Sequence, residues 1–185
     1  MRRPPRIKWG PFKNDFIAAS AMTESSAASL IELQAKLGYS FRDSGLMRLA
    51  LTHPSVSHES PGTSKHNQRL EFLGDSVLGL ALTSELYARF PEYGEGPLTK
   101  ARAQMVNRKA LAAQAKALSI GPALVLSRGE ELSGGRERAS ALADSFEALL
   151  GAIYLDGGFE AAREVVRSEE HTSELQSPCN LVCRL

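Results

Sequence analysis

Cysteine is almost absent from this 185-residue chain, because its two cysteines, Cys179 and Cys183, both lie in the last nineteen positions. The rest of the chain therefore has no disulfide framework and no thiolate metal site. No apolar run approaches the roughly 20 residues needed to cross a bilayer, and no secretory leader pattern follows the basic amino terminus. We therefore predict a cytoplasmic protein with no membrane contact. The composition, 43% hydrophobic and 23% charged, is typical of one globular domain and excludes collagen-like, coiled-coil and disordered chains.

The chain also lacks an excess of either charge, since 22 Lys and Arg face 21 Asp and Glu. The distribution is uneven: residues 1–27 carry a net +3, residues 28–166 a net −1 and the last nineteen a net −1. A near-neutral body excludes binding of nucleic acid by positive charge alone. If the body handles a polyanion, something else must neutralise the phosphates.

Composition divides the chain into three parts. Residues 1–27 mix Pro, Arg and isolated aromatics without periodicity and predict a loose basic extension, within which Met22 is an alternative start. Residues 28–166 carry the helical patterns of one domain. Residues 167–185 lack this helical pattern and resemble the translation of a sequencing-library adapter. We therefore interpret them as non-native and expect the last helix to be truncated after Val166.

No alternating strand pattern recurs in the body, so the predicted fold class is all-α. Three glycines inside the expected helices, Gly74, Gly79 and Gly151, predict close helix approach, because glycine costs about 1 kcal/mol there relative to alanine. We expect loops over 54–67 and 127–139 and leave 120–126 undecided between strand and helix. The expected helices are 29–37, 43–50, 68–90, 99–118, 141–155 and 159–166.

Two of these helices each carry a pair of acids on one face. Glu71 and Asp75 are four positions apart in a stretch from 70 to 88 that holds no Lys or Arg. Asp144 and Glu147 are three positions apart in a stretch from 139 to 162 that likewise lacks a basic residue. Residues at these spacings are neighbours on a helix surface, and like charges there repel.

Unpaired carboxylates in apolar helices lose hydration worth several kcal/mol each unless a cation compensates. Oxygen ligands without Cys or nearby His favour Mg²⁺, with Mn²⁺ as a substitute, over Zn²⁺. The alternative interpretation is that the acids only mark the solvent-exposed edges of two amphipathic helices. A metal site of this kind is suited to hydrolysis of a phosphodiester, and bridging cations would hold a polyanion on a near-neutral protein.

Three segments resemble the ribonuclease III family. They are HNQRLEFLGDSVLGL at 66–80, which is similar to the family's signature helix, LGYSFRDSGLMRLALTHPS upstream and ALADSFEALLGAIYLDGG downstream. The resemblance extends from about Leu37 to Val166, with the motifs in the family's order and spacing.

The resemblance implies the all-helical endonuclease fold of the family and a homodimer in which two signature helices meet, with Phe72 inserted into the partner. It implies a divalent-metal site at Glu71, Asp75, Asp144 and Glu147, with Asp75 and Glu147 as the catalytic pair. Gln68 and Glu95 match accessory positions of the cleavage valley. The implied activity is cleavage of double-stranded RNA, in rRNA and mRNA precursors, to 5′-phosphate and 3′-hydroxyl ends, without a small-molecule cofactor.

Two departures from the family pattern modify these expectations. Gln68 stands where the family often has Glu, and we expect a tuning effect because Gln still offers a hydrogen-bonding oxygen. The double-stranded-RNA-binding domain that usually follows in bacterial members is missing from the sequence, and we expect RNA affinity to suffer more than chemistry.

Two rival functions remain open from the sequence. An all-α, Mg²⁺-dependent nucleoside triphosphate pyrophosphohydrolase also clusters acids around the ion, and release of pyrophosphate from free nucleotides would identify it. A non-cleaving RNA-binding module would have dispensable acids.

Overall fold

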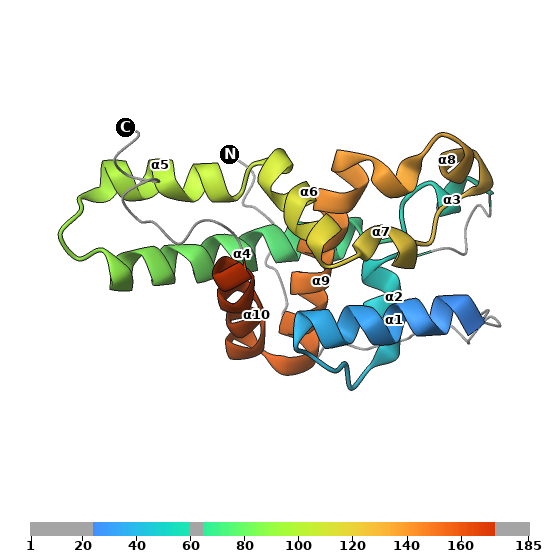
Figure 1. Ribbon diagram of the computed structural model, residues 1–185, viewed down its shortest axis with the longest axis horizontal. Coiled ribbons are helices and arrows are strands. Elements are labelled where there is room, and N and C mark those ends of the chain that lie inside the picture. The colour runs from blue at the N-terminus through green and yellow to red at the C-terminus, as the bar shows by residue number, and fades with distance from the viewer. Residues whose placement is uncertain (1–23, 60–64, 173–185) are drawn as a thin grey trace, which may run out of the picture.

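Helix α9 (Ala139–Gly157) runs through the middle of the computed structural model, which describes residues 24–59 and 65–172 (Figure 1). From 141 to 153 every residue of α9 is buried except Asp144 and Glu147. A helix that is apolar on nearly all sides must be covered on nearly all sides. The fold is therefore built around α9, with the two acids at the one face that stays open.

The described helices confirm the all-α prediction. In the described ranges the only β pairing is one isolated parallel bridge between Thr52 and Val125. No helix in those ranges is both long and apolar enough to cross a membrane. The other helices are α1 (Glu24–Leu37), α2 (Ser44–Ala50), α3 (Val56–Glu59), α4 (Gln68–Arg89), α5 (Glu95–Met105), α6 (Arg108–Ala117), α7 (Ile120–Ala123), α8 (Arg128–Leu132), the 3₁₀ helix η1 (Gly135–Glu137) and α10 (Phe159–Thr172).

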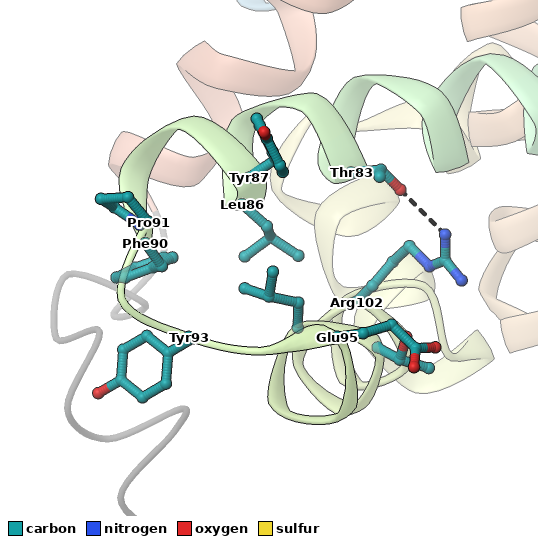
Figure 2. A pocket seen from close by; sticks show the side chains of 10 residues that line it. Thr83, Leu86, Tyr87, Phe90, Pro91, Tyr93, Glu95 and Arg102 are labelled. Atoms are coloured by element: carbon teal, nitrogen blue, oxygen red, sulfur yellow. Dashed lines mark hydrogen bonds between the residues drawn. The ribbon is translucent and has the colours of Figure 1, made fainter.

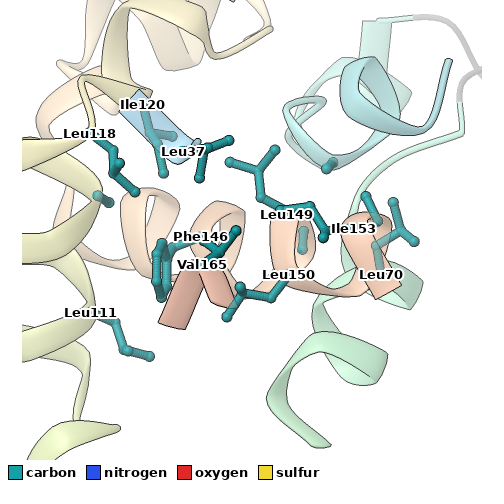
Figure 3. Packing of buried hydrophobic residues seen from close by; sticks show 14 of the residues in the cluster. Leu37, Leu70, Leu111, Leu118, Ile120, Phe146, Leu149, Leu150, Ile153 and Val165 are labelled. Atoms are coloured by element: carbon teal, nitrogen blue, oxygen red, sulfur yellow. The ribbon is translucent and has the colours of Figure 1, made fainter. Parts of the chain in front are cut away.

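Aliphatic side chains from most of these helices meet on α9 to form one core (Figure 3). Leu37 of α1, Leu70 of α4 and Leu111 of α6 belong to this core together with Phe146 and Leu149 of α9. Each of these five side chains is at least 95% buried. Burial of a side chain of this size contributes about 1.5–3 kcal/mol relative to exposure, so the core fixes α9 against α1, α4 and α6.

Two glycines let the backbones of α4 and α9 touch. A Cβ at position 74 would overlap the backbone carbonyl oxygen of Glu147, and a Cβ at position 151 would overlap the carbonyl oxygen of Leu70. The predicted close approach is confirmed for Gly74 and Gly151. It is wrong for Gly79 within one chain, because a Cβ there would meet nothing within 4 Å.

Hydrogen bonds join the end of α9 to the segment between α1 and α2. The carboxylate of Asp156 accepts hydrogen bonds from the Tyr39 hydroxyl (2.6 Å) and from the backbone N–H groups of Arg42 and Asp43 (both 2.9 Å). Burial, together with the hydrogen bond to Asp156, raises the pKa of Tyr39 to about 12. These hydrogen bonds place α2 beside α9. Asp43 then caps α2, because its carboxylate accepts a hydrogen bond from the N–H of Gly45.

The single helix expected over 99–118 is wrong. The chain forms α5 and α6 instead, and Asn107 begins the second by accepting a hydrogen bond from the N–H of Ala110. An Asn cap satisfies a free N–H at the start of a helix, which favours a new start over continuation. α5 also begins earlier than expected, so Pro97 lies in its first turn, where its missing N–H costs nothing.

Three shorter segments also differ from their predictions. The expected loop over 54–67 contains α3, and the expected loop over 127–139 contains α8 and η1. Arg136 orders the segment 127–139, because its guanidinium donates hydrogen bonds to the carbonyls of Gly121, Pro122 and Leu124. The undecided segment 120–126 begins as α7 and ends in the bridge at Val125.

The predicted boundaries of the domain stay predictions. α10 continues past Val166 to Thr172, across the point where the non-native tail is expected to begin. Residues 1–23 of the predicted extension and residues 173–185 of the predicted tail, with Cys179 and Cys183, lie outside the described residues.

Candidate metal and RNA-cleavage site

The two predicted acid pairs lie where α4 crosses α9. Glu71 and Asp75 are in the first half of α4, and Asp144 and Glu147 are in the first half of α9. The helices cross at Gly74, whose backbone lies directly against the carbonyl of Glu147. Each helix therefore carries its acid pair close to the crossing. Asp75 is exposed, whereas the other three acids are half-buried.

Glu147 is the acid that the other three affect most. Burial and, after it, the charges of Asp75, Glu71 and Asp144 together raise the pKa of Glu147 to about 7. Charges raise each other's pKa only when they are close, so all four carboxylates share one electrostatic environment. The prediction that the acids are unaccompanied by a cation within their helices is consistent with this shift.

Burial and neighbouring charges also shift the pKa of Glu71 and of Asp144. Burial raises the pKa of Glu71, and Asp144 and Asp75 raise it further. Burial also raises the pKa of Asp144, against the opposing charges of Arg108 and His53. The helix α6, which begins at Arg108, thus places one guanidinium beside the acids.

The raised pKa of Glu147 makes the ion-free protein less stable as the pH rises. The folded state holds a proton on Glu147 up to about pH 7, whereas an unfolded glutamate loses it near 4.5, so the free energy of unfolding falls between these values. We expect Glu147→Gln to raise the free energy of unfolding at pH 8, in buffer with a chelator, by about 1–2 kcal/mol, after discounting for partial exposure.

Urea unfolding of Glu147→Gln and wild type at pH 8 and pH 4.5 checks this expectation, because the difference should vanish at the lower pH. Glu92→Gln, at an exposed position in the turn after α4, is the control. Equal stability of Glu147→Gln and wild type at pH 8 would contradict it.

The donor set fits a hard divalent cation. Four carboxylates supply only oxygen ligands, which Mg²⁺ and Mn²⁺ prefer, and a cation would relieve the repulsion that adds to the raised pKa of Glu71 and Glu147. In residues 24–59 and 65–172, no three His, Cys, Asp or Glu side chains already close on a common point as ligands would. The acids are therefore in mutual electrostatic reach, while their role as ligands stays a prediction.

The two accessory residues lie at different distances from the acids. Gln68 is exposed at the start of α4, one turn before Glu71 and on the same face. Glu95 instead lines a pocket of about 540 Å³ between the end of α4 and the start of α5, with Thr83, Tyr87, Phe90 and Arg102 (Figure 2). Thr83 is eight residues beyond Asp75, or about 12 Å along the helix, so Glu95 is not beside the acids of its own chain.

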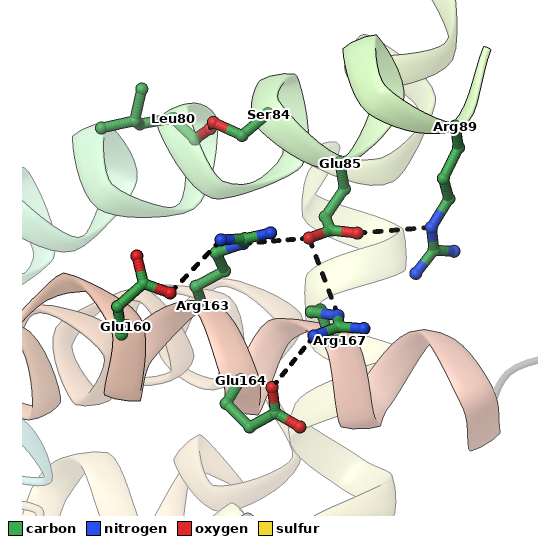
Figure 4. Close-up of polar contacts among 8 residues, drawn as sticks. All are labelled: Leu80, Ser84, Glu85, Arg89, Glu160, Arg163, Glu164 and Arg167. Atoms are coloured by element: carbon green, nitrogen blue, oxygen red, sulfur yellow. Dashed lines mark hydrogen bonds and ion pairs between the residues drawn. The ribbon is translucent and has the colours of Figure 1, made fainter.

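The third acid of α4, Glu85, does have cationic partners. Its buried carboxylate pairs with Arg89 (3.3 Å) one turn later and with Arg163 (3.0 Å) of α10, and Arg167 lies 3.7 Å away (Figure 4). The sequence places the partners of α10 about 80 positions away, so a search within the helix missed them. Glu85 therefore joins α10 to α4 and is not part of the metal site.

The chain is similar to ribonuclease-III-like proteins along most of its length. The family model of ribonuclease-III-like proteins matches residues 43–172. The protein named Ribonuclease 3 from Syntrophobacter fumaroxidans is 51% identical over 136 residues, which are 73% of this chain and 56% of that protein. Its namesake from Desulforamulus reducens is 53% identical over 135 residues, covering 72% of this chain and 55% of that protein.

The fold matches solved structures of the same kind. The crystal structure of the nuclease domain of ribonuclease III from Campylobacter jejuni is 40% identical, with a TM-score of 0.72, over 78% of this chain and 96% of that one. A second structure of that domain, described for flexibility in a region involved in dimer formation, is 42% identical with a TM-score of 0.70 and covers 76% of this chain and 95% of that one.

The all-α fold of the described residues is thus similar to the nuclease-domain fold of these proteins. The chain belongs to the ribonuclease-III-like family. It spans a little over half the length of the curated relatives that it matches.

Proposed function

We propose that this protein is a divalent-metal-dependent endoribonuclease that hydrolyses double-stranded RNA to 5′-phosphate and 3′-hydroxyl ends. The observation that carries the proposal is the half-buried carboxylate of Glu147, whose pKa is raised to about 7 by burial and by the charges of Asp75, Glu71 and Asp144. Membership of the family and the fit to a nuclease-domain fold support the reaction class. Precursors of rRNA and mRNA in the cytoplasm are the substrates that we propose.

In this proposal, Glu71, Asp75, Asp144 and Glu147 hold Mg²⁺, or Mn²⁺ in its place. The bound ion would activate the attacking water and neutralise charge developing on the scissile phosphate. Glu147 must release its proton before it can act as a ligand, so ion binding should strengthen as the pH rises through about 7. Arg108, whose charge lowers the pKa of Asp144, is placed to attract a phosphate oxygen beside the acids.

Exposed apolar side chains along α4 support a homodimer. Phe72, Leu80 and Tyr87 are 80%, 56% and 77% exposed and fall within about 80° of arc on one face of the helix. Large apolar groups exposed in a row on one helix mark an interaction surface. Gly79 lies beside Leu80 with open space around it, so a second helix would meet no Cβ there.

A two-fold axis near Gly79 and Leu80 would bring the ends of two antiparallel α4 helices together. In such a symmetric interface, position i of one copy contacts position j of the other, and the reverse. Phe72 of one copy then faces the pocket beside Tyr87 in the other, about 22 Å along the helix. The same symmetry brings Glu95, which lines that pocket, toward the acids of the opposite copy and supports its proposed accessory role.

We expect Phe72→Ala to raise the dimer dissociation constant at least about 100-fold, because each of two symmetric contacts loses roughly 1.5–3 kcal/mol of apolar burial. Sedimentation velocity over a concentration series measures this constant. Leu132→Ala is a matched control, because Leu132 is 81% exposed on α8 and away from α4. Unchanged dimerisation of Phe72→Ala would contradict the proposed interface.

The activity itself is tested on a labelled RNA duplex of about 30 base pairs with Mg²⁺ or with a chelator. We expect internal cuts only with the ion, and ligation assays should identify 5′-phosphate ends. Incubation with nucleoside triphosphates tests the rival pyrophosphohydrolase, which would release pyrophosphate. Binding of the duplex without any cut, with or without Mg²⁺, would instead identify the non-cleaving module.

A further inference from the structure

Asn67, the residue that precedes α4, is a polar side chain enclosed in the protein. It is 1% exposed, and its amide nitrogen donates to the carbonyl of Ala50 and to the hydroxyl of Ser145, both at 3.3 Å. Its side chain does not cap α4, although caps are the usual role of Asn at such a position. The amide oxygen of Asn67 has no partner among the described residues. A buried amide that is only partly satisfied is costly and needs an explanation.

Ser145, the partner of Asn67, lies between the two acids of α9. Its side chain is fully buried, and it follows Asp144 directly and precedes Glu147 by two positions. Asn67 in turn precedes Glu71 by one helical turn, and its carbonyl accepts the hydrogen bond from the N–H of Glu71. The Asn67–Ser145 bond therefore joins the turn that carries one acid pair to the turn that carries the other.

The two glycine contacts alone do not fix the angle between α4 and α9. The close contacts of Gly74 with Glu147 and of Gly151 with Leu70 all fall within about one turn of each helix, so contacts beyond that turn are needed to resist rotation about the crossing. Asn67 lies seven residues before Gly74 and three before Leu70, or about 10 Å and about 4.5 Å along α4, so a bond there lies outside the crossing and opposes rotation. Rotation about the contact would move Glu71 and Asp75 relative to Asp144 and Glu147.

We propose that Asn67 and Ser145 are positioning residues that set the angle between α4 and α9, and thereby the spacing of the four carboxylates for a divalent cation. This inference rests on the proposed function. Neither side chain would touch the ion or the RNA. Groups that orient metal ligands typically contribute 10–100-fold to metal affinity or activity, and we expect an effect of that size.

Titration calorimetry of Mn²⁺ binding to the full chain, without RNA, tests the proposal. The variants are Asn67→Ala, Ser145→Ala and the double variant, and Ser145→Ala removes only one hydroxyl should Asn67→Ala fail to fold. Asp43→Ala is the matched control, because it removes the cap of α2 and lowers stability at a site away from the acids. Circular dichroism verifies that each variant is folded, and single-turnover cutting is measured in parallel.

We expect at least about tenfold weaker Mn²⁺ binding in both single variants, no further loss in the double variant, and wild-type affinity in Asp43→Ala. Wild-type affinity in both single variants overturns the inference and leaves the proposed function intact. An equal loss of Mn²⁺ affinity in Asp43→Ala overturns the inference as well, because general destabilisation would then explain the weaker binding. A wild-type protein that binds no Mn²⁺ and cuts no RNA overturns the proposed function itself.

Discussion

Replacing Glu147 with Gln is expected to lower the turnover of double-stranded RNA at least about 1,000-fold. Glu147 is the acid on which the charges of Asp75, Glu71 and Asp144 all act, so it lies at the electrostatic centre of the proposed site. Gln keeps the shape of the side chain but removes the negative charge that a divalent cation needs. Loss of one electrostatic contribution to the transition state typically costs 100- to 1,000-fold, and loss of a ligand adds weaker ion binding.

RNA affinity should change less than about threefold in the same variant, because a duplex is held mainly by contacts to its many phosphates. Single-turnover cutting with Mg²⁺ and filter binding with a chelator separate the two quantities. Glu92→Gln, which removes an exposed charge outside the site, should cut at the wild-type rate. Parallel loss of binding and cutting in Glu147→Gln would count against a metal-binding role for this residue.

The second large effect is expected from Gly74→Ala. A methyl group there overlaps the backbone carbonyl oxygen of Glu147, which cannot rotate away as a side chain would, so α4 and α9 must separate. Overpacking in a core typically costs 1–3 kcal/mol, and we expect about 3 kcal/mol or more of lost unfolding free energy.

Urea unfolding followed by circular dichroism measures this loss. Gly129→Ala in α8 is the control, because its Cβ would meet nothing within 4 Å. That control should match wild type or gain a few tenths of a kcal/mol from better helix propensity. A Gly74→Ala protein as stable as the control would show that the helices can part without cost.

The candidate site was predictable because its signal is local. Acids three or four positions apart share a helix face, and Asp144 and Glu147 interrupt a segment that is otherwise buried from 141 to 153. Gly74 and Gly151 were predictable as packing positions for the same reason, since glycine in a helix interior needs a compensating contact. Periodicity alone therefore located the helices of the site, and the family resemblance supplied the pairing between them.

The features that escaped prediction depend on distant residues or on short local choices. Arg163 and Arg167 pair with Glu85 across about 80 positions, which no pattern within α4 reveals. The break between α5 and α6 depends on one side chain, Asn107, inside a continuous alanine-rich pattern. Gly79 gave the same signal as Gly74, but its neighbour, if the proposed dimer forms, belongs to a second chain.

The bond between Asn67 and Ser145 also has a consequence for biosynthesis, because it joins residues 78 positions apart. Contacts of such long sequence separation form slowly, since a large loop must be closed before they contribute. While the protein is being translated, the turn of α4 that bears the first two acids leaves the ribosome well before α9 exists. If the protein has the proposed nuclease activity, a nascent chain could not cut the RNA around it until nearly the whole domain has emerged.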